Sequence, residues 1–126
     1  MTKADVYAKH NMARISPKKM GIVMDVVRKM PLTQAKVTLS FDKSKAARML
    51  LKVLKSAQSN ATNNNNFKAE NLYISELFVN GAKMYKLGRP GSKGRFSPIL
   101  KRNSHITVGL KNIEVKKENV KKEVIE

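Results

Sequence analysis

Between Leu77 and Ile113 the chain has no acidic residue, although lysine and arginine are frequent there. At the centre of this stretch lies KLGRPGSKGRFSPILKR, residues 86–102, in which cations alternate with glycines, prolines and Phe96. Guanidinium and ammonium groups bind phosphate oxygens, and glycine lets the backbone come close to a partner. The chemistry available to these residue types is therefore the binding of a polyanion.

The whole chain has the same bias. It has 126 residues, a formal net charge of +17 and a pI near 10.3, and 41% of its residues are hydrophobic. This length is typical of one domain with a modest core. A charge of this size repels itself unless an anion neutralises it, so nucleic acid is the first candidate partner and an anionic membrane surface the second.

The chain lacks the residues that several other kinds of chemistry require. The absence of cysteine excludes disulfides, thiol catalysis and cysteine-type zinc sites, and the two histidines have no carboxylate cluster nearby in sequence. There is no nucleophile–base motif and no phosphate-binding glycine loop opening a helix. Asp5 and Lys9 stand where a signal peptide needs an apolar run, and no segment approaches the roughly 20 apolar residues of a membrane span. We therefore expect no enzyme, no cofactor, no metal and no membrane span. We expect a soluble protein in the cytosol or inside an organelle of bacterial origin.

The hydrophobic pattern predicts the elements that must position the cations. They are a strand at 6–15, helices at 17–30, from 32 to 37 or 39, and at 43–62, and strands at 71–80 and 104–111. Ser16 and Pro17 are a favourable N-cap and first residue for the first helix, which is expected to end before Pro31. The run Asn63–Asn66 is expected to form a loop after the third helix.

The helix at 43–62 has the strongest pattern. Its apolar stripe consists of Ala47, Leu50, Leu51, Leu54, Ala57 and Ala61. The opposite face carries Lys45, Arg48, Lys52 and Lys55. This basic face is either a solvated surface or a surface turned toward phosphates, and the sequence leaves both open.

The two last strands and the segment between them predict a β-hairpin. In the strand at 104–111, Ile106, Val108 and Leu110 point one way, whereas His105 and Thr107 point the other way. If the two strands pair antiparallel, residues 81–103 extend them by arms of about ten residues, which reach about 30 Å at about 3.3 Å per residue.

Such a hairpin needs a partner, because it buries too little apolar surface to be stable alone. Its cations also repel one another; they are Lys83, Lys86, Arg89, Lys93, Arg95, Lys101 and Arg102. RNA supplies the missing negative charge, and apolar or stacking surface is offered by Met84, Tyr85, Leu87 and Phe96. The alternative is a flexible basic loop with no fixed partner.

Five short blocks carry a family resemblance. They are ARISPKKM at 13–20, KVLKSA at 52–57, SE at 75–76, KGR at 93–95 and ILKRNSHITV at 99–108, in this order. From about Ala8 to Leu110 the chain resembles the bacterial-type ribosomal protein L twenty-two family of the large subunit. It departs from the family pattern at Asn103, where threonine is usual, and at Gly91 and Pro98, where many members carry arginine.

The resemblance implies an α+β fold, with a three-stranded antiparallel sheet packed on three helices and a long protruding β-hairpin at about 80–103. We expect a single domain at 1–111 and a flexible charged tail at 112–126. The implied role is structural, and not enzymatic. The protein would bind large-subunit rRNA, help its assembly, and line the nascent polypeptide exit tunnel with its hairpin. The implied partners are rRNA, neighbouring large-subunit proteins and the nascent polypeptide, with no DNA. If the protein is cytosolic, the resemblance implies the bacterial cytoplasm.

The RNA-binding residues are expected at the strand-to-helix junction, along the hairpin and at the start of the last strand. They are Arg14, Lys18, Lys19, Lys83, Lys86, Arg89, Lys93, Arg95, Lys101, Arg102 and His105. His105 either binds RNA, satisfies a backbone group at the sheet edge, or ligates a metal. Tyr85 either stacks on a base, faces the tunnel, or packs on the neighbouring arm. A DNA-binding module built on the three helices is the other function considered, but the charge is greatest on the hairpin rather than on one recognition helix.

Overall fold

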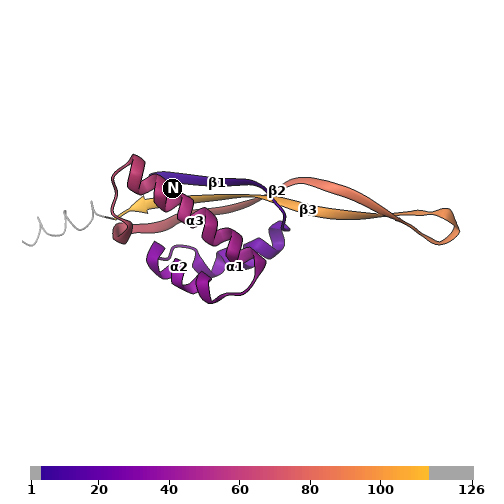
Figure 1. Cartoon of the computed structure of the whole chain (residues 1–126), viewed down its shortest axis with the longest axis horizontal. Coiled ribbons are helices and arrows are strands. Elements are labelled where there is room, and N and C mark those ends of the chain that lie inside the picture. Colours follow the sequence, from indigo (N-terminus) through magenta and orange to yellow (C-terminus); the bar gives the residue numbers. More distant parts are fainter. Residues whose placement is uncertain (1–3, 114–126) are drawn as a thin grey trace, which may run out of the picture.

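Three strands form one antiparallel sheet in the order β1-β3-β2, so that β3 lies in the centre (Figure 1). The strands are β1 (Val6–Ala13), β2 (Leu72–Pro90) and β3 (Phe96–Asn112). The structure is a computed structural model, which describes residues 4–113. Asn112 belongs to β3 and not to the predicted tail, and residues 114–126 of that tail lie outside the described residues.

Three helices cover one face of the sheet: α1 (Pro17–Val27), α2 (Leu32–Phe41) and α3 (Lys45–Asn64). The first packs mainly on β2, and the third packs on β1 and β3. The predicted α+β fold, with its sheet, helices and protruding hairpin, is confirmed (Figure 1).

The core forms where the apolar stripes of the helices meet the inner face of the sheet. Ile106, Val108 and Leu110 are fully buried, as their alternation predicts. From α3 the buried residues are Ala46, Ala47, Leu50, Val53, Leu54, Ala57 and Ala61. The predicted stripe is thus correct except that Leu51 is only half-buried and that Ala46 and Val53 also belong to it.

Several helix boundaries differ from the prediction: the third helix runs from Lys45 to Asn64 instead of 43–62, and the end of the first helix is set by a contact distant in sequence. The first helix ends at Val27 rather than at Met30, because the Met30 carbonyl accepts a hydrogen bond from the Ile74 N–H (3.0 Å) at the edge of β2. Lys29 makes the turn with a φ of 64°. The second helix continues past Leu39 to Phe41.

The asparagine run is not simply a loop. Asn63 and Asn64 are the last residues of α3, Asn65 is its C-cap, and Asn66, which follows the C-cap, has a φ of 56°. Asparagine adopts this left-handed conformation more readily than most residues, and the Phe67 N–H then bonds back to the Ala61 carbonyl (3.1 Å). The run therefore terminates the longest helix.

The first strand is shorter than predicted and carries an irregularity. It ends at Ala13 instead of Ile15, and its register with β3 shifts between His10 and Ala13. Met12 has a φ of 58° at this bulge. The polar interruption at residues 9–11 in the sequence pattern thus lies beside a real break in the strand ladder.

The hairpin is a direct continuation of β2 and β3 beyond the helices (Figure 1). Its pairing runs outward from Ala82↔Asn103 to Pro90↔Phe96. The tip turns at Ser92–Gly94, and the ring of Phe96 lies against the backbone of Gly88, where it leaves no room for a β-carbon. Most hairpin side chains are exposed, so little apolar burial holds the two arms together.

We expect the hairpin to open far more often than the sheet that it extends. In free protein, amides at 83–89 and 96–101, apart from Pro98, should exchange with solvent much faster than those at 74–80 and 104–110, because local opening of the arms exposes little apolar surface. Hydrogen exchange followed by NMR measures this difference. Equal protection of both regions in free protein would contradict the expectation.

Candidate nucleic-acid interface

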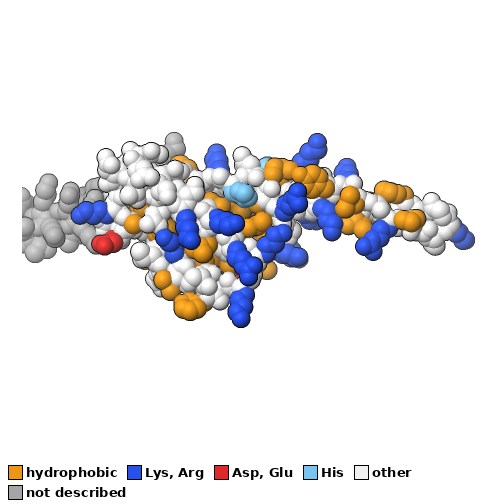
Figure 2. Space-filling model, viewed as in Figure 1, with side chains coloured by type: hydrophobic (Ala, Val, Ile, Leu, Met, Phe, Trp, Pro, Cys, Tyr) orange, Lys and Arg blue, Asp and Glu red, His pale blue; other side chains and the backbone are white. Residues whose placement is uncertain are grey.

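The predicted RNA-binding residues lie at the surface along the hairpin and around its root. Ten of the eleven are exposed, and only His105 is half-buried. Figure 2 shows lysine and arginine side chains along the hairpin and gathered at its base, whereas acidic colour appears only at the opposite end of this face. On this face the positive charge therefore extends from the globular part to the tip of the hairpin.

These cations have no acidic partner within the part of the chain that the structure describes. Across residues 4–113 the one salt bridge joins Arg28, just after α1, to Asp25, near the end of α1 (2.7 Å). None of the predicted RNA-binding residues takes part in an ion pair there. Their charge stays available to an outside anion.

An open groove with a volume of about 990 Å³ lies where the hairpin leaves the globular part. We call it the root groove. Its lining comes from the β1–α1 junction, the first turns of α1 and α3, and both hairpin arms. The lining residues are Arg14, Ile15, Ser16, Lys19, Lys45, Tyr85, Leu87, Leu100, Lys101, Arg102 and Asn103. Five of these residues are cationic and none is acidic.

Local hydrogen bonds hold the globular side of the root groove. The Ser16 side chain caps α1 by accepting from the Lys19 N–H (3.3 Å). Lys45, the first residue of α3, donates from Nζ to the Arg14 carbonyl (2.7 Å). This bond ties the start of α3 to the β1–α1 junction, and the N-terminal ends of both helices add partial positive charge beside the groove.

A β-bulge shapes the hairpin side. Ala82 pairs with Asn103 and Tyr85 pairs with Lys101, so two residues of β2 oppose Arg102 alone. The buried Asn103 donates from its amide to the Lys83 carbonyl (2.8 Å), which compensates for the interrupted ladder. Asn103 thus has a structural function at the position where it departs from the family pattern.

His105 lies beside the bulge of β1 and outside the root groove. Its Nδ1 accepts a hydrogen bond from the Met12 N–H (3.1 Å). Because Nδ1 is an acceptor, Nε2 carries the ring proton and can donate to another group. Of the three interpretations left open by the sequence, satisfaction of a backbone group is the one that the structure shows.

The structure divides the predicted site into two parts. It brings Arg14, Lys19, Lys101 and Arg102 together in the root groove. It leaves Lys18 outside the groove and spreads five further cations over the hairpin, namely Lys83, Lys86, Arg89, Lys93 and Arg95. Lys45 joins the groove although it was not among the predicted contacts. The only sequence signal for it was its place on the basic face of the third helix.

Over residues 4–113, no helix is both long and apolar enough to cross a membrane. In that same range, no three His, Cys, Asp or Glu side chains gather as they would around a metal ion.

The fold and the site define a small basic α+β protein that presents its cations on an extended hairpin and around the groove at its root. The family model described as ribosomal protein L22p/L17e matches residues 8–111, and the chain belongs to this family. The resemblance found in the sequence is therefore confirmed. This is a family of structural ribosomal proteins and not of enzymes.

Individual relatives agree with the family. The chain is 47% identical over 102 residues to the large ribosomal subunit protein uL22 of Caldicellulosiruptor saccharolyticus, which covers 81% of this chain and 84% of that protein. It is 43% identical over 98 residues to the uL22 of Mesoplasma florum, with 78% and 88% covered. It is also 43% identical over 101 residues to the uL22 of Mycoplasma capricolum, with 80% and 91% covered.

The bond to Met12 predicts a measurable structural role for His105. Replacement His105→Phe keeps an aromatic ring but removes the acceptor, and should lower the free energy of unfolding by about 0.5–1 kcal/mol. His10→Phe, on the exposed surface of β1, is the matched control and should change stability less. Urea unfolding measures both variants. Equal stabilities for the two would show that the bond to Met12 contributes nothing.

Proposed function

We propose that the chain is a structural protein of the large ribosomal subunit that binds large-subunit rRNA and helps the rRNA to assemble. Its hairpin lines the nascent polypeptide exit tunnel. Neighbouring large-subunit proteins are further partners, and the place of action is the ribosome in the bacterial cytoplasm or in an organelle of bacterial origin. Family membership supports the ribosomal role, because the relatives named above are large-subunit proteins.

The observation that carries the rRNA-binding part is the unpaired charge. Seven cations on the hairpin and five in the root groove, two of them shared by both sets, have no acidic partner within residues 4–113. A folded chain gains nothing from such an arrangement, because the cations repel one another. Phosphates of RNA remove that repulsion, and release of their counterions drives binding.

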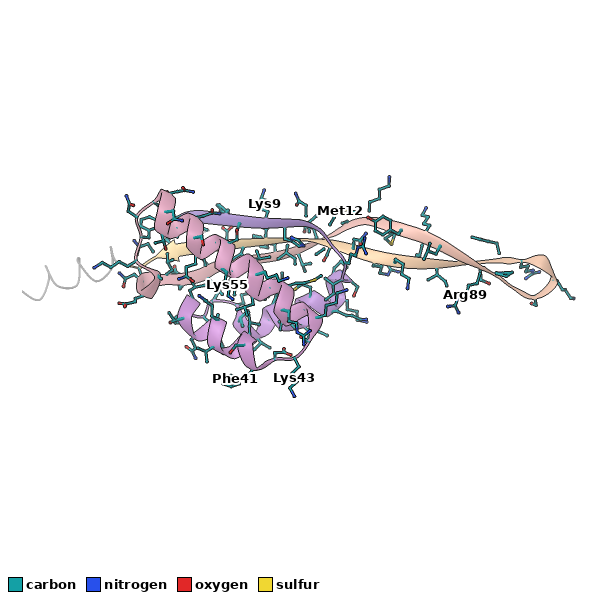
Figure 3. All side chains as sticks on the ribbon, viewed as in Figure 1. Lys9, Met12, Phe41, Lys43, Lys55 and Arg89 are labelled. Carbon is teal, nitrogen blue, oxygen red and sulfur yellow. The ribbon has the colours of Figure 1, made fainter. Side chains whose placement is uncertain are left out.

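The tunnel part rests on shape. The hairpin extends well beyond the helices (Figure 1) and narrows to a turn with Lys93 at φ 57° and Gly94 at φ 72°. Arg89, on the outer half of β2, points away from the arm in Figure 3. A narrow projection with cations on its outside suits a passage walled by RNA. Its tip is then free to meet a peptide.

The proposed rRNA binding should depend steeply on salt. If all seven hairpin cations met phosphates, log K would fall with log salt with a slope of at most about −6, at about −0.9 per contact. The double replacement Lys101→Gln with Arg102→Gln should make the slope shallower by about 2. The matched control, Lys29→Gln with Lys68→Gln, removes the same charge outside the root groove and the hairpin. Filter binding to large-subunit rRNA at several salt concentrations measures the slopes. A similar loss in the control pair would mean that binding responds to net charge alone.

The tunnel proposal predicts contact between the hairpin tip and a nascent chain. A photo-crosslinking amino acid in place of Ser92 should form a covalent crosslink to a labelled nascent polypeptide in translating ribosomes. The same group at Ser59, exposed on α3, should not. The crosslink is detected on a gel as label that migrates with the tagged protein from purified ribosomes. Crosslinks from Ser59 but not from Ser92 would place the wrong end of the molecule in the tunnel.

A further inference from the structure

The root groove combines a cationic rim with an apolar floor. Ile15, Tyr85, Leu87 and Leu100 line it between the five cations. The side chain of Tyr85 is 51% exposed, and those of Leu87 and Leu100 are 53% and 40% exposed. Folding leaves these three side chains half open to water, although side chains of this size are usually covered when they gather in one patch.

Contacts between the cations and phosphates do not explain the apolar floor of the groove. The outside of an RNA duplex presents phosphates, sugars and groove edges, while the flat faces of its bases stay stacked inside. A duplex lying across the groove would therefore satisfy the rim and leave the floor uncovered. An unpaired nucleotide offers both surfaces at once, since its base face is apolar and its flanking phosphates are anionic.

We propose that the root groove holds an unpaired nucleotide of RNA, with its base stacked on Tyr85 and its phosphates against the cationic rim. This assignment rests on the proposed function and specifies its ligand. The side chain of Tyr85 lines the groove and is 51% exposed, so part of its ring is open to a partner. Leu87, two residues further along β2, lies on the same side of the arm as Tyr85 and would exclude water from the base. Leu100 pairs with Lys86 and lines the groove from the other arm.

The rim is arranged to hold phosphate on either side of such a base. Arg14 and Lys19 reach the groove from the β1–α1 junction, whereas Lys101 and Arg102 reach it from β3. Lys45 stands at the start of α3 and is held by its bond to the Arg14 carbonyl (2.7 Å). Cations thus approach from the globular side and from the hairpin side, so a strand passing through the groove meets them before and after the base.

The test compares one RNA strand in two states. The probe is a single-stranded RNA of about ten nucleotides with a central 2-aminopurine, and its partner probe is the same strand annealed to its complement. The full chain should bind the single strand more tightly, and stacking on Tyr85 should quench 2-aminopurine fluorescence. Bright 2-aminopurine in the saturated single-strand complex would overturn the proposal.

Three variants identify the residue responsible. Tyr85→Ala should weaken single-strand binding about 5- to 150-fold, the range of one lost base stack, and should weaken duplex binding much less. Tyr85→Phe keeps the ring and should restore both the quenching and the affinity. Phe41→Ala removes another aromatic side chain, 82% exposed on α2 and far from the groove, and should behave as the unmodified chain (Figure 3).

The remaining outcomes distinguish this proposal from the proposed binding of rRNA by the cations, on which it rests. An equal effect of Tyr85→Ala on both probes, or no effect on either, overturns the unpaired-nucleotide site and leaves rRNA binding by the cations intact. Displacement of the single strand by hexaglutamate, with the same dependence on Tyr85, would assign the groove to an acidic peptide instead. Failure of the full chain to bind either RNA probe would overturn both proposals together.

Discussion

The pairing of β2 with β3 inside the globular part is the constraint on which the hairpin depends. The row Leu77↔Val108 buries apolar side chains against the helices, and a slip by one residue would turn those side chains toward solvent. This buried register continues along the same two strands to Pro90↔Phe96. The arms bury little surface of their own, so the core sets their alignment and direction. A basic projection can be built on so small a domain because its register is determined elsewhere.

The β-bulge at Ala82–Tyr85 interrupts the regular pairing of β2 with β3 beside the root groove. One extra residue on β2 increases the local twist at the root of the hairpin, where the arms leave the domain beside the β1–α1 junction. Buried Asn103 compensates for the lost ladder bond by donating to Lys83. Without this irregularity, the cations of β3 would continue a regular strand surface. With it, Arg102 and Arg14 line the same groove although 88 positions in the sequence (102 − 14) separate them.

The sequence predicted the elements well because their patterns are local. The alternation of Ile106, Val108 and Leu110 and the stripe of α3 each require only neighbouring residues. One wrong boundary and one question that the sequence left open were set by distant contacts. The end of α1 depends on a bond between Met30 and Ile74, and the role of His105 depends on a bulge in β1. The root groove could not be predicted as a unit, because its lining comes from four separated segments that only the fold brings together.

Charge and apolar surface act over different ranges at this interface. Attraction between exposed cations and phosphates extends over about a Debye length, near 8 Å at physiological ionic strength, and weakens as salt rises. Burial of apolar surface acts only at contact and is not screened by salt. Hairpin cations therefore favour approach to any RNA surface, whereas the floor formed by Tyr85, Leu87 and Leu100 contributes only when a matching surface is seated on it. The root of the hairpin thus combines cations, which attract RNA over a distance but without selectivity, with an apolar floor, which is selective but acts only at contact.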